Sequence, residues 1–121
     1  LGLPGETPEM MAQTSRYIGQ AGADGVKLHL LHVLRNTDLA AEWQAGRVQT
    51  LELPEYIAAL ELCLQNLPPE VVIHRLTGDG AKRDLLAPLW SGDKKRVLNA
   101  IRRAFEQDDL VQGSALSAAC E

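Results

Sequence analysis

The residues best suited to chemistry lie in one apolar stretch, residues 25–34, which reads GVKLHLLHVL. Turn and cap residues flank this stretch, so it is predicted to be a strand. It carries Lys27, His29 and His32, a cation and two imidazoles able to hold an anion or to move a proton. Side chains alternate along a strand, which puts Lys27 and His29 on one face and His32 on the other. Because α/β folds keep their ligands near the carboxyl ends of strands, we expect the chemistry near these three residues.

A second polar pair, His74 and Arg75, lies in another short apolar segment, residues 71–76. The Arg75 guanidinium could hold a carboxylate or phosphate through a two-pronged contact. It could equally pair with Glu6 or Asp79 and close the fold. The sequence leaves both interpretations open.

The three histidines are poor candidates for a zinc site. His29 and His32 point to opposite faces of a regular strand, and His74 would have to supply a third ligand, whereas catalytic zinc needs three convergent ligands. Each is therefore expected to be a partly buried histidine with a hydrogen-bond partner. Cys63 and Cys120 are the two cysteines, and their wide separation makes no metal signature. The sequence therefore predicts no metal site.

Two other features could bind anions, and in both we favour a structural role. Residues 1–7 place Gly and Pro before a helix, but they lack the Lys of a P-loop and the glycine spacing of a dinucleotide fingerprint. Residues 93–107 form a predicted helix whose cations are Lys94, Lys95, Arg96, Arg102 and Arg103. We interpret these cations as a solvated face of that helix.

Helices and strands alternate along the chain. Thr7 is the predicted cap of a helix over residues 8–21, with Pro8 at its first position. The inner stripe of this helix is predicted to be Met11, Thr14, Ile18 and Ala21. After the strand at 25–34 we expect helices 38–45 and 54–66, a strand 71–76, a looser segment 81–90 and a helix 93–107. Such alternation implies parallel strands joined by right-handed crossovers.

Two parallel strands are too few for a sheet covered on both faces. The fold class is therefore predicted to be α/β, a partial parallel (β/α) barrel or part of an open α/β sheet. Residues 1–112 form the predicted domain, and residues 113–121 a small, polar, flexible tail. An incomplete sheet leaves an unpaired edge, through which we expect the chain to form homo-oligomers.

Composition narrows the functional classes. The 121 residues are 45% hydrophobic and 23% charged, as in an ordinary globular domain, and the net charge is −4. This charge argues against broad nonspecific binding to nucleic acid or to anionic membranes. No apolar run reaches the length of a membrane span, and no signal peptide is visible. With two unpaired cysteines, a cytoplasmic setting is the expectation.

Several segments together resemble the radical S-adenosylmethionine (SAM) superfamily. They are GLPGET, DGVKLHLLHVLRNTDL, LPEYIAALELCLQNLPPEVVIHRLTGD and LLAPLWSGDKKRVLNAI. They are similar to the carboxyl half of YhcC-like bacterial iron–sulfur proteins. VVIHRLTGD together with APLW is specific to that branch, whereas GLPGET with a later VLRNT is shared more widely.

The resemblance implies a (β/α)6 barrel in which a 4Fe-4S cluster and SAM generate a 5′-deoxyadenosyl radical. It implies that the stretch at 25–34 is the sixth strand of that barrel. On the cofactor side the resemblance places Leu31, His32, Val33 and Glu6. On the substrate side it places Lys27, His29, His74 and Arg75.

The sequence departs from the family at one decisive point, because the three-cysteine motif that holds the cluster is absent. Three thiolates are needed to fix the cluster. We therefore expect no cofactor in this chain, with SAM and the 4Fe-4S cluster held by an intact parent protein. The expected partner is the amino-terminal half of the barrel. The sequence predicts a carboxyl-terminal fragment of a radical SAM oxidoreductase that is inactive alone. The alternative is a non-catalytic binding or assembly module on the same scaffold.

Overall fold

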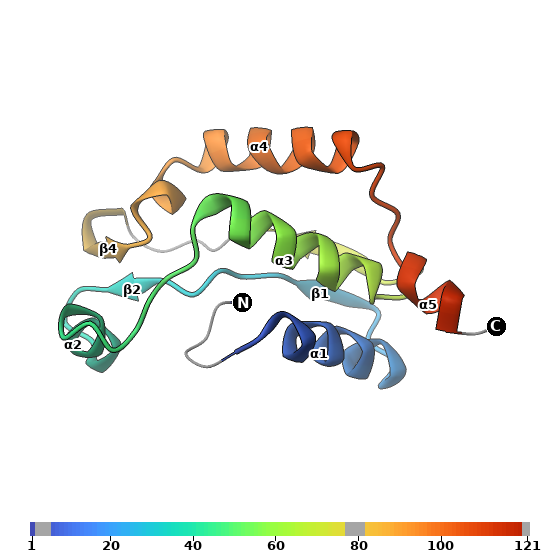
Figure 1. The fold of residues 1–121 in the computed structure, drawn as a ribbon, viewed down its shortest axis with the longest axis horizontal. Coiled ribbons are helices and arrows are strands. Elements are labelled where there is room, and N and C mark those ends of the chain that lie inside the picture. Colours follow the sequence, from blue (N-terminus) through green and yellow to red (C-terminus); the bar gives the residue numbers. More distant parts are fainter. Residues whose placement is uncertain (2–5, 77–81, 120–121) are drawn as a thin grey trace.

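The computed structural model describes residue 1 and residues 6–76 and 82–119 (Figure 1). The helices are α1 (Pro8–Gln20), α2 (Asp38–Gln44), α3 (Leu53–Gln65), α4 (Lys94–Gln107) and α5 (Ser114–Ala119), with 3-10 turns at Lys82–Asp84 and Leu89–Gly92. The strands are β1 (Gly25–Lys27), β2 (Val33–Leu34), β3 (Val72–Arg75) and β4 (Leu85–Ala87). This is a mixed α/β fold with a small parallel sheet, β1–β3, and an antiparallel pair, β2–β4. In Figure 1, α3 lies between α4 and α1, and it contacts both. Leu28 and Leu30 pack against these three helices, which we call the helical layer.

Local capping explains where the long helices begin. The Thr7 hydroxyl accepts a hydrogen bond from the Met10 N–H at 3.2 Å, which confirms the predicted cap of α1. Glu52 and Glu55 form a reciprocal capping box at the start of α3. The carboxylate of Asp93 accepts from the N–H of Arg96 at the start of α4. Each cap satisfies an N–H that would otherwise have no partner within its helix.

The prediction of one strand over residues 25–34 is wrong. The structure divides this stretch into β1 and β2, with residues 28–32 between them. β1 pairs with β3 in parallel, whereas β2 pairs with β4 in antiparallel orientation. The chain must exchange one partner for the other between the two pairs, and so it cannot keep a single regular ladder. β4 lies in the segment 81–90, for which the sequence predicted no strand.

The predicted parallel arrangement is confirmed and extends to residue 1. The amino group of Leu1 donates to the His29 carbonyl at 2.6 Å, and the Leu31 N–H donates to the Leu1 carbonyl at 2.8 Å. This pair of bonds is the pattern of a parallel ladder, with Leu1 opposite Leu30. The segment after β1 therefore has a backbone neighbour on each side. Leu1 lies on one side, and Arg75, whose carbonyl accepts from the Leu28 N–H, lies on the other.

Helix α3 provides the centre of the core. Tyr56 and Leu60 of α3 are fully buried, and they pack with Leu30, Val97 and Ile101. A second cluster joins α3 to α1 and contains Met11, Ala59 and Cys63. Helix α3 therefore packs against α1, against α4 and against the residues that follow β1, which we call the strand segment.

The predicted inner stripe of α1 is wrong in part. Met11 is buried, as predicted, together with Ala12 and Ser15, whereas Thr14 and Ala21 are exposed. The buried set includes two small residues because α1 lies close against α3. Short side chains on that stripe allow the two helix backbones to approach each other.

The segment after α4 contains an element that the sequence did not predict. The side-chain amide of Gln112 donates to the carbonyls of Pro68 and Val71, each at 2.8 Å, and the Gly113 N–H donates to the Leu64 carbonyl at 2.9 Å. Gly113 has a φ of 82°, a value that glycine adopts freely. α5 then begins at Ser114. The flexibility expected of residues 113–121 remains a prediction.

Strand β3 leaves one edge open within the described part of the chain, where it pairs with β1 alone. Val72, at the start of β3, is 55% exposed. An open strand edge can pair with another chain. Homo-oligomer formation through this edge remains a prediction.

We predict that Leu60→Ala lowers the free energy of unfolding by about 2–5 kcal/mol, because it leaves a cavity where α3 meets α4 and the strand segment. Chemical denaturation monitored by circular dichroism measures the change. Leu89→Ala is the matched control, since Leu89 is 74% exposed, and it should shift the same free energy by at most about 0.5 kcal/mol. Equal losses in the two variants would contradict the assignment of α3 as the centre of the core.

Candidate functional site

One face of the parallel pair carries polar side chains and lies opposite the helices. Along β1 and the residues after it, Lys27 and His29 are exposed, whereas Leu28 and Leu30 pack into the core beneath the helices. The alternation predicted for this part of the chain is therefore present. We call the face that carries Lys27 and His29 the open face.

His74 of β3 belongs to the same face. A Cβ atom built on Gly25 would collide with the His74 ring, so the imidazole lies across Gly25. Gly25 and Lys27 are two residues apart in β1, and residues two apart share a face. The structure thus brings His74 to the face of Lys27 and His29, and any residue larger than glycine at position 25 would displace it.

Arg75 lies next to this group through the backbone register. Arg75 pairs with Lys27 in the parallel ladder, whereas the preceding pair is Val26 with Ile73. His74 therefore has no partner residue in β1, and the register is irregular at this point. The Leu28 N–H donates to the Arg75 carbonyl at 2.8 Å. Arg75 is half-buried. Its proposed partner Asp79 lies outside the described residues.

His32 faces a different environment. Its side chain lines a hollow on the helix side, with Tyr56, Trp90 and Lys94. The Nε2 atom of His32 is buried and makes no hydrogen bond in the described structure. At this nitrogen the expected hydrogen-bond partner is not found among the described residues. Burial lowers the pKa of His32, and the nearby His29 lowers it further.

Two aromatic side chains form the wall of this hollow. Their ring centroids lie 5.8 Å apart. The Tyr56 hydroxyl donates to the Leu76 carbonyl at 2.7 Å, and the Trp90 Nε1–H donates to the Leu51 carbonyl at 3.0 Å. Burial raises the pKa of Tyr56 far above its ordinary value. Tyr56 is therefore a neutral donor that fixes the chain just after β3.

These aromatic residues were missed by the sequence analysis as neighbours of His32. APLW was noted for its family resemblance, and Tyr56 was not distinguished from the other residues of its helix. A tyrosine on the apolar stripe of a helix is a signal that could have been used, because a buried hydroxyl needs a partner.

The residues expected to contact SAM are placed apart from one another. Val33 is fully buried against Ala40 and Ala87, so its side chain is not available to a ligand. Glu6 lines a groove between α1 and α3, and His32 lines the hollow between α3 and α4. That hollow has a volume of about 10 Å³, enough for one water molecule and too small for an adenine ring. The side chains of His32 and Val33 are thus enclosed by other residues of this chain, and Leu31 lies half-buried at the strand edge beside Leu1. Contact of these residues with SAM remains a prediction.

The described residues also do not fit an iron–sulfur cluster. Within them, no group of three or more His, Cys, Asp or Glu side chains could hold a metal ion. Cys63 is buried, and burial raises the pKa of its thiol. A raised pKa keeps the sulfur protonated, whereas cluster ligands are thiolates. Cys120 lies outside the described residues.

The chain matches the Radical_SAM C-terminal domain family over residues 23–107. It therefore belongs to this family. YtqA of Bacillus subtilis (strain 168) is 35% identical over 112 residues, which are 93% of this chain and 35% of YtqA. YhcC of Escherichia coli (strain K12) is 36% identical over 116 residues, 96% of this chain and 37% of YhcC. The chain thus spans just over a third of the length of these relatives.

A solved structure shows the same fold. The archaeal Methanocaldococcus infernus Elp3 with an N-terminal deletion superposes with a TM-score of 0.72 and 20% identity, over 92% of this chain and 26% of that one. At this level of identity the similarity shows the fold alone. In the part of the chain that is described, no helix is both long and apolar enough to span a membrane.

The hollow beside His32 predicts a pH dependence of stability. Because folding lowers the pKa of His32, the unfolded chain takes up a proton first as the pH falls through the ordinary value of 6.5. The free energy of unfolding should therefore decrease from about pH 7.5 to about pH 5, and His32→Leu should reduce that decrease. Urea denaturation at the two pH values is the measurement.

The matched control for this test is His74→Leu, because His74 is exposed and outside the hollow. This control should keep the pH dependence of the wild type. A His32→Leu variant that loses as much stability on acidification as the wild type would contradict the assignment.

Proposed function

We propose that this chain is the carboxyl-terminal part of a radical SAM iron–sulfur oxidoreductase of the cytoplasm, and that it forms the substrate-side wall of the enzyme. The observation that supports this proposal is the open face, where Lys27, His29 and His74 are gathered opposite the helices. Membership of the Radical_SAM C-terminal domain family supplies the reaction class. The relatives are more than two and a half times as long as this chain, which leaves room for the remainder of a (β/α)6 barrel.

The open face offers two kinds of contact to a substrate. Lys27 is a mobile cation suited to a carboxylate or phosphate, and each imidazole can donate to or accept from a polar group. Arg75 lies beside Lys27 in the register and can add a planar, two-pronged contact. We assign these residues to binding and orienting the substrate, with His29 or His74 as the candidate proton donor or acceptor.

In this proposal the remainder of the protein supplies the cofactors. Bound there, the 4Fe-4S cluster and SAM would generate the radical that abstracts a hydrogen atom from substrate. The side chains described here form no group of three or more that could hold a metal ion. Their part is to hold the substrate, and the segment near Leu31 contributes at most a backbone edge to SAM.

The amino-terminal half of the barrel is the proposed partner of the sheet. Leu1 already forms a parallel bridge beside Leu30, so a strand that ends at Leu1 would continue the sheet on that side. On the other side the open edge of β3 is free to pair in the described structure. Pairing at these two edges would turn the open face toward the interior of a barrel.

We predict that Lys27→Met and His29→Leu, each made in the complete protein, lower substrate turnover by about 10²-fold or more while fold and iron content stay unchanged. Both side chains are exposed here, so their loss removes no core contact. The readout is the stimulation of 5′-deoxyadenosine formation by an extract that contains the substrate. Arg47→Met, an exposed cation on the chain after α2, is the control. Normal turnover in Lys27→Met, or loss of its fold, would exclude the substrate-side assignment.

We also predict that the 121-residue chain by itself assembles no iron–sulfur cluster, because it has two cysteines, of which Cys63 is buried. Anaerobic reconstitution with iron and sulfide, followed by iron analysis and visible absorption, tests this. Stoichiometric iron, about four per chain, with a brown chromophore would overturn the prediction. The same treatment of the complete protein serves as the positive control, and a complete protein without cluster would favour the binding or assembly module.

A further inference from the structure

The outer side of the helical layer carries two surfaces of opposite charge. Helix α4 presents cations, and the groove between α1 and α3 presents carboxylates. The cations lie along the first three turns of α4, whereas the acidic groove runs from α1 across α3 to Asp108, the residue that ends α4 (Figure 1). We infer that this layer is an interface between two copies of the chain, in which the cationic stripe of α4 in each copy lies in the acidic groove of the other.

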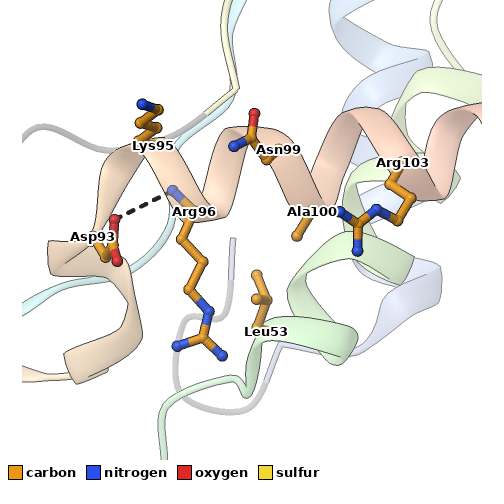
Figure 2. A pocket seen from close by; sticks show the side chains of 7 residues that line it. All are labelled: Leu53, Asp93, Lys95, Arg96, Asn99, Ala100 and Arg103. Atoms are coloured by element: carbon orange, nitrogen blue, oxygen red, sulfur yellow. Dashed lines mark hydrogen bonds between the residues drawn. The ribbon is translucent and has the colours of Figure 1, made fainter.

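The cationic stripe consists of Arg96, Ala100 and Arg103. Figure 2 shows both guanidinium groups on the side of α4 where Leu53 of α3 lies, with Ala100 between them. Neither arginine forms an ion pair in the described part of the chain, where the carboxylate of Asp93 accepts from the backbone N–H of Arg96. Arg96 also lies in the first turn of α4, where the helix dipole disfavours a cation. The stripe thus holds positive charge that nothing described in this chain neutralises.

The acidic groove has a volume of about 740 Å³ and an apolar floor that includes Met11, Ala58 and Leu62. Glu55 and Glu61 of α3 and Asp108 lie along it. Burial, a hydrogen bond with Asp108 and the charge of Asp108 raise the pKa of Glu61, so two carboxyl groups lie together. Neither of them takes part in the ion pairs found between described residues. A cation supplied from outside would relieve this repulsion.

The spacing of the two surfaces agrees. Arg96 and Arg103 are about 10.5 Å apart along the axis of α4, and Glu55 and Glu61 are about 9 Å apart along α3. A small residue lies between the charges in both helices, Ala100 in α4 and Ala58 in α3. Two helices with alanine at the contact can approach closely, which brings the guanidinium groups within reach of the carboxylates.

A second copy is the favoured occupant because one chain supplies both complementary surfaces. A two-fold axis roughly parallel to α3 would exchange the α4 side of the layer with the α1 side, and so would form the same contact twice. The open face and the sheet edges lie away from this layer. The interface is therefore compatible with a barrel completed by the rest of the protein.

The experiment compares the mass of the complete protein and its charge-reversed variants by light scattering at low salt. The wild type should have the mass of two copies and dissociate as salt rises, since screening weakens exposed pairs. Arg96→Glu with Arg103→Glu should be monomeric, and so should Glu55→Arg with Glu61→Arg. An equal mixture of these two double variants should recover the dimer, because each supplies the surface that the other lacks. Glu70→Arg, on an exposed turn outside the groove, is the control and should leave the mass unchanged.

Three results would overturn the inference. One is a monomeric wild type, which excludes a second copy. Another is a dimer that survives both double variants, which would assign association to a different surface such as the β3 edge. The third is a pair of monomeric variants that do not recover when mixed although circular dichroism shows that both are folded.

Discussion

The structure depends on the packing of α3 against one face of the strand segment. Tyr56 and Leu60 lie at the point where this segment, α3 and α4 meet, and both are fully buried. The helices cover one side of the parallel pair, so the apolar residues after β1 turn toward α3 and the polar ones turn away. The candidate site exists because the helices cover only one face of the parallel pair. Side chains alternate along a strand, so Lys27 and His29 lie on the other face.

The same contact orders the ends of the elements. The Tyr56 hydroxyl holds the Leu76 carbonyl just after β3, and Trp90 reaches back to Leu51 just before α3. Both bonds join residues far apart in the sequence, and both are made by aromatic side chains whose rings fill the core. Buried polar atoms of this kind need partners, and here the partners are backbone groups at the margins of strands and helices. Packing and hydrogen bonding therefore fix the fold at the same places.

Local chemistry made the long helices predictable. Thr7, Pro8 and Asp93 mark helix starts through capping rules that act within a few residues, and the predicted parallel pairing followed from the order of elements. The division of residues 25–34 and the existence of β4 could not be predicted in this way. The division of residues 25–34 and the formation of β4 both depend on which strands pair in the folded chain. The apolar sequence of residues 25–34 is compatible with one ladder or with two.

The candidate site was predictable to the extent that it follows from alternation. Lys27, His29 and His32 lie on the sides that a regular strand dictates, although the strand itself is interrupted. Alternation did not predict the surroundings of Val33, because β2 belongs to a separate cluster in which Val33 is buried with Ala40 and Ala87. The surroundings of His32 were beyond the sequence, since its hollow is built by Tyr56 and Trp90 from two distant segments.

The approach of His74 to Gly25 has an entropic consequence. The imidazole lies against the backbone of Gly25, in the space that a side chain at position 25 would fill. A side chain that is ordered in the folded protein loses less rotational freedom when a ligand binds, so its contact contributes more fully to affinity. Because Gly25 has no side chain, the His74 ring can lie against the backbone of β1, and this contact favours the position from which His74 would bind a ligand.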